Sequence, residues 1–402
     1  MGSESSETGS ELPETGLGPS LQRPALPRAA VILLMLGSAT LATFGLAAVG
    51  GIFTPAFLAF VLTLCVHPVR RWLQAHGIPR GIATGGSIAA VFALLAGFAG
   101  ALVAALAQFS ALLPQFAPQI ADAGASISRW LAAAGFGPEQ VQAVQSGFNP
   151  SSIVGFLSGL LGNISNVVGA LVIILTLLIL MAVDGSRMPA LLTHLTAHRP
   201  ELVSALGGFA SGVRRYMVAT TVLGVAQGLF NWLVLVILQV PGALLWGLLS
   251  FICSFIPNIG YFIAIIPPLF FGYLTGGWAT VIAVVIVYGG INAVVQSIVQ
   301  PKYVGNAVNL SETLTFLSVL FWAVVLGPIG AILAVPLTLL ARTLLLDSDP
   351  SLAWWRPITG DHKDLESLLK QEDAAIKARR SREGRRGRPG AALPRPGDAP
   401  AA

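Results

Sequence analysis

Long apolar runs, separated by short polar or glycine-rich breaks, dominate the chain. They cover residues 29–49, 51–66, 82–107, 157–183, 216–239, 243–274, 278–299 and 313–346. A helix needs roughly 20 apolar residues to cross the hydrocarbon core of a bilayer. The pattern therefore predicts an all-α integral membrane protein with about eight transmembrane passages.

Glycine and proline mark the boundaries between several of these runs. Gly50-Gly51 predicts a tight helical hairpin between the first two runs, and His67-Pro68 ends the second. Pro241-Gly242 stops the fifth run, and Gly276-Gly277 separates the sixth from the seventh. These residues interrupt helices, so each passage is expected to end where they occur.

Two runs, 243–274 and 313–346, are too long for one simple crossing and contain helix breakers. The first is interrupted at Pro257-Asn258 and at Pro267-Pro268. The second is interrupted at Gly327-Pro328, Gly330 and Pro336. The two runs share a short similarity, in which Ile259-Gly260, Ala264 and Pro267 correspond to Ile329-Gly330, Ala334 and Pro336. A broken or re-entrant segment suits both runs, and two kinked but ordinary spanning helices are the alternative.

Paired interruptions of this kind point to a transport pathway, because a broken helix exposes backbone N–H and C=O groups at membrane depth. Amide side chains one helical turn apart would add polar groups to this pathway. They occur as two pairs, Asn292 with Gln296 and Gln227 with Asn231. Hydrogen bonding between helices is the alternative role for each pair. The predicted substrate pathway comprises Pro257, Asn258, Gly260, Pro267, Asn292, Gln296, Gln300, Pro301, Gly327, Gly330 and Pro336.

Two segments inside the membrane domain (29–346) are expected to lie outside the bilayer. Residues 108–155 are interrupted by prolines and glycines and carry an apolar stripe of Leu113, Phe116, Ile120, Ile127, Trp130 and Leu131, which predicts an extracytoplasmic insert of short amphipathic helices. Residues 186–215 predict a loop and a cytoplasmic amphipathic helix, with Leu202, Leu206, Phe209 and Val213 as its stripe and Arg214-Arg215 at its end.

Composition agrees with the membrane assignment. Charged residues make up 10% of the chain, against about 25% in soluble domains, and none occurs between Tyr216 and Pro301. The net charge of +5 arises at the ends of apolar runs and in the C-terminal tail, which argues against a nucleic-acid partner. If all eight runs cross, Lys and Arg gather on one side. Both termini are then cytoplasmic, in a bacterial inner membrane.

The two tails are expected to be soluble. Residues 1–28 predict a disordered cytoplasmic tail without a cleavable signal peptide. Residues 347–402 predict a cytoplasmic basic tail that includes a short amphipathic helix with Leu365, Leu368, Leu369 and Ile376. Residues 377–395 hold eight basic residues and one acid, which would attract anionic lipid; a solvated disordered tail is the alternative.

The sequence contains no recognisable enzyme motif. It has no phosphate loop, dinucleotide fingerprint or zinc-type histidine pattern, and His194 and His198 lack a third ligand. We therefore expect no catalytic residue, metal or cofactor. Coupling to protons or sodium usually needs a carboxylate in the membrane. Asp184 and Glu312 are the candidates, although both sit at span ends, where solvation of a helix terminus is the alternative role.

Several motifs resemble the autoinducer-2 exporter family of bacterial membrane proteins. They are Ala182-Val183-Asp184-Gly185, the stretch from Ile256 to Ala264, Gln300-Pro301-Lys302, and the stretch from Gly327 to Leu337. The resemblance implies an integral membrane transporter that forms homo-oligomers, with members linked to export of a quorum-sensing furanone or to sodium/proton exchange. Many members carry Leu-His-Pro after the seventh span, where this chain reads Asn309-Leu310-Ser311-Glu312-Thr313.

The leading functional hypothesis is a secondary transporter or exporter of a small solute or signalling molecule, coupled to H+ or Na+. Two other classes stay open. One is a non-transporting scaffold or receptor that holds partners through residues 108–155 and the basic tail, and the other is a passive channel.

Overall fold

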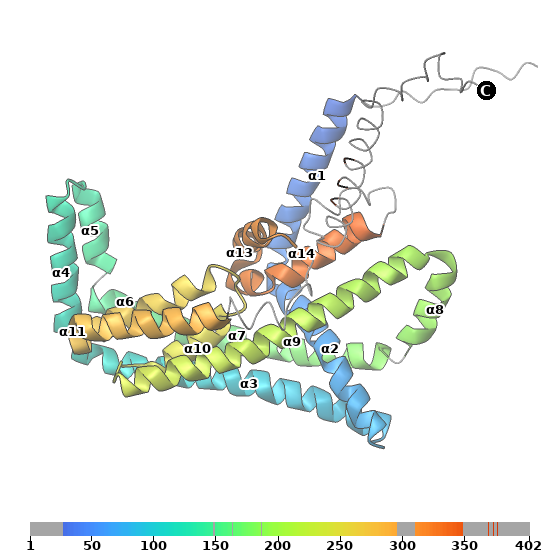
Figure 1. Ribbon diagram of the computed structural model, residues 1–402, viewed down its shortest axis with the longest axis horizontal. Coiled ribbons are helices and arrows are strands. Elements are labelled where there is room, and N and C mark those ends of the chain that lie inside the picture. Colours follow the sequence, from blue (N-terminus) through green and yellow to red (C-terminus); the bar gives the residue numbers. More distant parts are fainter. Residues whose placement is uncertain are drawn as a thin grey trace, which may run out of the picture. The chain divides into compact units, whose positions relative to one another are not determined.

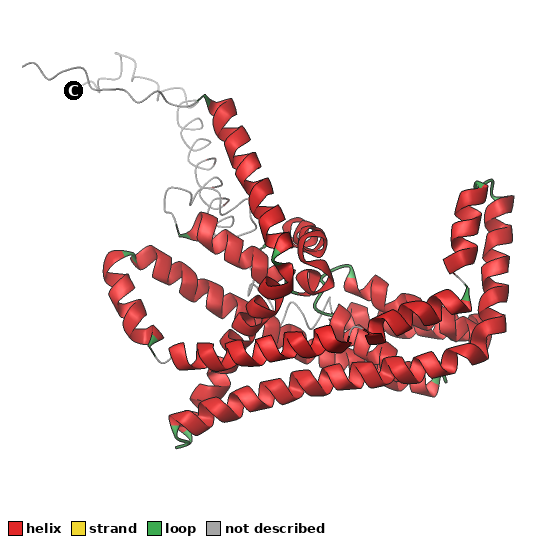
Figure 2. Cartoon of the chain, turned by 180° about the vertical axis from the view of Figure 1, so that it is seen from behind, coloured by secondary structure: helices red, strands yellow, loops and turns green. Residues whose placement is uncertain are grey.

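A computed structural model describes residues 27–348 apart from 148, 163, 186 and 296–309, and beyond these only residues 369, 373 and 376. These residues form helices and connecting loops, with no strand among them (Figure 2). The all-α prediction is therefore confirmed for the described part of the chain. The predicted tail 1–28, except residues 27 and 28, and most of the predicted tail helix fall outside it.

The chain divides into two compact units, residues 1–48 and 49–402. The described helix of the first unit is α1 (Arg28–Ala48). The second unit holds the other described helices, most of which are labelled in Figure 1. They are α2 (Gly50–Ala75), α3 (Arg80–Leu112), η1 (Leu113–Phe116), α4 (Ala117–Ala133), α5 (Pro138–Gly147), α6 (Pro150–Gly162), α7 (Ile164–Asp184), α8 (Met188–His198), α9 (Pro200–Ile237), α10 (Ala243–Cys253), α11 (Gly260–Val294), α13 (Glu312–Ile332), α14 (Ala334–Arg342) and η4 (Thr343–Asp347).

Six described stretches are long and apolar enough to cross a bilayer: Gly50–Ala75, Arg80–Ala133, Ser165–Asp184, Pro200–Ile237, Gly260–Val294 and Glu312–Ile332. Leu33–Ala48 and Ala243–Cys253 are shorter apolar helices. Together they lie in all eight predicted apolar runs, though not one to one. Large apolar side chains remain exposed on them, such as Val324 at 87% and Trp278 at 70%, as expected for surfaces that face lipid.

Three predicted boundaries are wrong. His67-Pro68 do not end the second helix, because α2 continues through Pro68 to Ala75. Arg214-Arg215 do not end a helix, since α9 continues through them to Ile237, and arginine is a good helix former. Pro267-Pro268 do not break α11; proline keeps a helical φ, and membrane helices tolerate the lost hydrogen bonds.

Helices α9 and α10 pack closely because glycines face each other. A Cβ atom added at Gly228 would lie 2.8 Å from the Gly247 carbonyl oxygen, and one added at Gly247 would lie 2.6 Å from the Trp232 Cβ. Small residues let two backbones approach in this way inside a membrane. Helix α11 packs against both members of this pair.

The insert 108–155 is helical and partly packed on the core. Leu113 and Ile120 are fully buried in the cluster that contains Phe109 and Trp246, whereas Trp130 remains 67% exposed. Helices α4 and α5 pack against each other. The first half of the predicted stripe is therefore a core face, while its second half is open. That the insert lies outside the bilayer stays a prediction.

Candidate functional site

The first break separates α10 from α11. Helix α10 ends at Cys253, and Asn258 takes a left-handed conformation with φ of 64°. A side chain at Gly260 would overlap the carbonyl oxygen of Cys253, so α11 starts directly on the last turn of α10. The Tyr216 hydroxyl of α9 donates to the Phe255 carbonyl at 3.3 Å. These contacts confirm the predicted interruption at Pro257-Asn258.

Helix α11 folds back on itself at Gly277, whose φ of 61° and ψ of −153° are essentially restricted to glycine. A Cβ at Gly272 would lie 3.1 Å from Thr280 and 3.8 Å from Val284. In a straight helix, residues 272 and 284 would be about 18 Å apart. The two arms therefore run antiparallel, as the predicted boundary at Gly276-Gly277 requires.

The second break is a hairpin at Gly327, with φ of 73° and ψ of −161°. Trp322 Nε1 donates to Thr338 Oγ1 at 3.0 Å. Sixteen residues separate these two positions, which a straight helix would place about 24 Å apart. A side chain at Gly330 would overlap the Trp322 carbonyl oxygen. The run 313–346 therefore turns back within its length and is not one kinked spanning helix.

The two breaks share the same local backbone arrangement. At each break a glycine lets the following helix pack directly against a carbonyl group of the preceding helix. Gly260 contacts the carbonyl of Cys253, and Gly330 contacts that of Trp322. Each is preceded by a residue of positive φ, Asn258 or Gly327. The short sequence similarity between Ile259-Gly260 and Ile329-Gly330 thus corresponds to a shared local geometry.

The fold also brings the two breaks together. Ile256 and Ile259, from the first break, pack against the cluster of Val319, Ala331 and Ala334 from the second. Phe255 and Leu333 lie together in a neighbouring cluster with side chains of α2 and α9. The antiparallel register of α11 places Asn292 near the level of Asn258, because Gly289 lies beside the Tyr261 hydroxyl. This junction is the candidate site.

A buried polar cluster lies at the meeting of α9, α10 and α11. Asn231 Nδ2 donates to Ser250 Oγ at 3.1 Å, and the Tyr288 hydroxyl lies beside Ser250. Asn231 is 0% exposed. Asn231 Oδ1 and Tyr288 Oη have no hydrogen-bond partner of good geometry among the described residues. Sequence analysis noted Asn231 but missed Ser250 and Tyr288, because nothing in their spacing marks them as neighbours.

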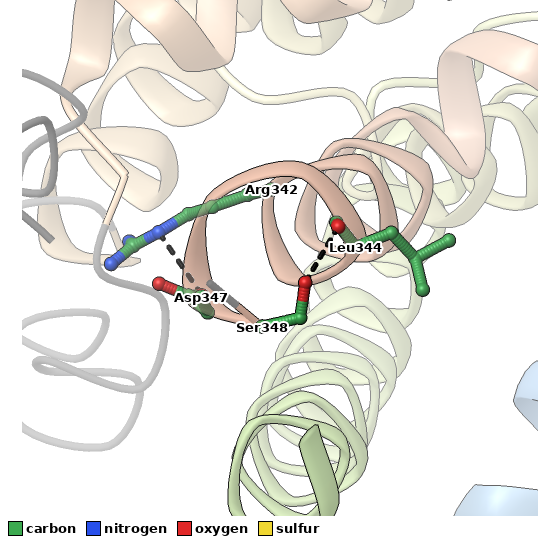
Figure 3. Close-up of polar contacts among 4 residues, drawn as sticks. All are labelled: Arg342, Leu344, Asp347 and Ser348. Atoms are coloured by element: carbon green, nitrogen blue, oxygen red, sulfur yellow. Dashed lines mark hydrogen bonds and ion pairs between the residues drawn. The ribbon is translucent and has the colours of Figure 1, made fainter. Parts of the chain in front are cut away.

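A partly buried ion pair links α14 to η4, at the end of the continuously described part of the chain (Figure 3). Arg342 Nε lies 3.4 Å from Asp347 Oδ2, and the two side chains are 8% and 23% exposed. The π-helical turn η4 carries Asp347 back toward Arg342, and Ser348 Oγ donates to the Leu344 carbonyl at 2.8 Å. The pair joins α14 to η4, both of which contact α9.

Residues 30–348 match the family model described as AI-2E family transporter. The chain belongs to this family. The match covers every contact described above for the two breaks, the polar cluster and the ion pair. It confirms the resemblance seen in the sequence and identifies the chain as a multi-pass membrane transporter.

Individual proteins agree with the AI-2E family match. The "AI-2 transport protein TqsA" of Escherichia coli is 27% identical over 314 residues, covering 78% of this chain and 91% of TqsA. YhhT of Escherichia coli is 25% identical over 308 residues, covering 76% of this chain and 88% of YhhT. A Haemophilus influenzae protein is 28% identical over 357 residues, covering 86% of this chain and 98% of its own length.

Within this AI-2E family chain, the predicted pathway residues fall into three groups. Those at the junction are Pro257, Asn258, Gly260, Gly327, Gly330 and Pro336, with Asn292 near its level. Pro267 lies farther along the first arm of α11. Gln296, Gln300 and Pro301 fall outside the described residues.

The predicted ion-coupling carboxylates lie at helix ends and away from the buried core. Asp184 is the last residue of α7, and Glu312 is the first of α13; both are exposed. Ser311 Oγ accepts a hydrogen bond from the Leu314 backbone N–H at 3.2 Å, so it caps α13. A negative charge at Glu312 is favoured there by the helix dipole alone.

Proposed function

We propose that this chain is a secondary transporter or exporter that moves a small solute or signalling molecule across the bacterial cytoplasmic membrane. The observation that carries the proposal is the packing of the two helix breaks against each other through Ile256, Ile259, Ala331 and Ala334. Paired interruptions at membrane depth are the feature by which transporters expose backbone groups to a substrate.

The chemistry of the junction suits a small polar substrate. The turn at 254–259 replaces regular helix hydrogen bonds with short turn bonds, such as those from the Ile256 N–H to the Cys253 carbonyl and from the Ile259 N–H to the Pro257 carbonyl. Each carbonyl oxygen there has two lone pairs and can accept a further hydrogen bond from a polar substrate. The name of TqsA assigns it AI-2 transport. An autoinducer-2-type furanone, a small molecule rich in hydroxyl groups, is therefore the first substrate to test for this chain.

The pathway is tested by flux measurements in proteoliposomes. Gly260→Ala and Gly330→Ala would push a Cβ into the Cys253 and Trp322 carbonyls and shift the returning helices. A displacement of about 1 Å at a reacting or binding group can cost on the order of 100-fold, so we expect flux to fall at least tenfold. Gly290→Ala is the matched control, because its Cβ would meet nothing within 4 Å. Wild-type flux in both junction variants, with normal membrane insertion, would refute the site.

Coupling to H+ or Na+ is proposed to involve Asp184, Glu312 or both, as the carboxylates at the ends of the spans. Proteoliposomes loaded with a pH-sensitive dye and given a sodium or lithium gradient would report proton movement. We expect such movement to be lost in Asp184→Asn or Glu312→Gln. Absence of proton movement in the unmodified protein would remove cation/proton exchange and leave solute export.

Two further features belong to the same proposal. A homo-oligomer would cover exposed apolar side chains of the insert, such as Ile127 and Trp130; light scattering of the purified protein would measure its size. Both termini are proposed to be cytoplasmic, which labelling of terminal cysteines in intact cells would test. A passive channel, the competing function, would give flux that neither saturates nor depends on an ion gradient.

A further inference from the structure

Basic side chains from two packed helices converge near one end of α2. Arg70 and Arg71 on α2 and Arg214 on α9 all lie within electrostatic range of the His67 imidazole. The helices are held together nearby by stacking of Phe60 on Phe209, with ring centroids 6.1 Å apart. The three guanidinium groups therefore share one region, although 143 residues separate Arg71 from Arg214 (214 − 71).

This basic cluster lacks acidic partners in the part of the chain that the structure describes, where none of the three arginines forms an ion pair. The end of α7 lies close by, since a Cβ on Gly185 would lie 4.0 Å from an Arg70 guanidinium nitrogen. The adjoining Asp184 is exposed and forms no ion pair with these arginines among the described residues. Arg70 Nε is buried without a hydrogen-bond partner among the described atoms.

The cluster sits where membrane-spanning segments meet the polar boundary. The apolar run of α2 ends at His67, and the charge-free run of α9 begins at Tyr216, directly after the arginines. Val69 and Trp72 beside them are 52% and 61% exposed. Exposed tryptophan is typical of the headgroup level of a bilayer. The arginines thus lie at the ends of two apolar runs, where a helix that spans a bilayer would meet the lipid headgroups.

We propose that Arg70, Arg71 and Arg214 form a binding site for a phosphate-type anion, filled by the headgroup of an anionic phospholipid. Guanidinium groups bind phosphate oxygens through paired hydrogen bonds, and basic pockets between membrane helices hold lipid headgroups. An excess of Lys and Arg on one side of the membrane explains why these residues are basic. It does not explain why arginines of two different helices lie around the same imidazole, that of His67. The bound lipid would hold α2 against α9, separately from the junction of the two breaks.

The test uses the full chain in nanodiscs of phosphatidylcholine with and without phosphatidylglycerol, followed by native mass spectrometry of the retained lipid. Each basic residue near an anionic surface contributes about fivefold in binding. We expect Arg70→Gln and Arg214→Gln each to lower retention of phosphatidylglycerol about fivefold and the double variant about 25-fold. Arg80→Gln, an exposed arginine that does not act on His67, should retain wild-type levels.

Two further arms separate the alternatives. Arg70→Lys keeps the positive charge and should retain most of the lipid, which guards against a variant that merely misfolds. Inorganic phosphate added to the detergent-solubilised protein should leave its melting temperature unchanged. Stabilisation by phosphate, lost in Arg214→Gln, would overturn the lipid as occupant in favour of a free anion. Equal lipid retention by the cluster variants and Arg80→Gln would overturn the site. Neither readout depends on transport.

Discussion

Single residues set the turns of this membrane domain, and two glycines do so through backbone conformation alone. Gly277 and Gly327 have nearly the same φ and ψ, in a region that other residues rarely enter. A Cβ added at either would meet nothing within 4 Å. Their role is thus conformational, whereas Gly260 and Gly330 are required by close contact.

This distinction predicts the cost of substitution. Gly277→Ala and Gly327→Ala should each lower the free energy of unfolding by about 1–3 kcal/mol, because the strained backbone persists without any compensating contact. Gly290→Ala, inside the same α11 with free space around it, should instead be neutral or stabilise by up to about 1 kcal/mol. Thermal unfolding of the purified variants would measure the difference. Equal stability of the three would mean that the turns at 277 and 327 differ from those described.

At the scale of secondary-structure elements, α9 and α10 pack closely, and glycines permit their contact. Gly247→Ala would bring a Cβ to 2.6 Å from Trp232 Cβ and 3.0 Å from the Gly228 carbonyl. Overpacking of this kind typically costs about 1–3 kcal/mol, and here it should also lengthen the Asn231–Ser250 hydrogen bond one turn away. Unfolding of Gly247→Ala should therefore occur at lower temperature than that of Gly100→Ala on α3, where nothing lies within 4 Å. An unchanged melting temperature would contradict the close packing.

Sequence patterns predicted the elements better than their connections. Hydrophobic run length identified the helices, and glycine pairs located the fold-back in α11, because both signals are local. The prediction that Arg214-Arg215 end a helix was wrong, because a charged pair can mark a membrane boundary without ending the helix. The prediction that Pro267-Pro268 interrupt a helix was wrong, because a proline within a membrane helix need not break it.

The candidate site was only partly predictable for a related reason. The breaks at Asn258 and Gly327 were visible as residue types, but their meeting through Ile256, Ile259 and Ala331 depends on tertiary packing. Ser250 and Tyr288 beside Asn231 carried no signal, since a serine and a tyrosine in apolar runs are common. Local chemistry can nominate residues for a site, whereas the packing of distant helices decides which of them act together.

At the scale of the whole molecule, the residues matched by the family can be distinguished in sequence from the two tails. The AI-2E family match ends at residue 348, and the ion pair of Arg342 and Asp347 closes the domain at the same point. Both breaks, the polar cluster and the arginine cluster lie before it. A transporter whose pathway lies within residues 30–348 should keep its flux without the tail, whereas a scaffold that holds partners through the basic tail should lose its function.

Deletion of residues 351–402 distinguishes the two functions. We expect the shortened protein to insert and to retain flux within roughly twofold, because the deletion removes no predicted pathway residue and no residue matched by the family model. The shortened protein should still retain the phosphatidylglycerol that we propose is held by Arg70 and Arg214, because both residues remain. The matched control is replacement of the tail's basic residues by glutamine, which keeps its length. If flux were lost on deletion but kept in this control, the tail itself would be part of the machinery, and the transport function could no longer be assigned to residues 30–348 alone.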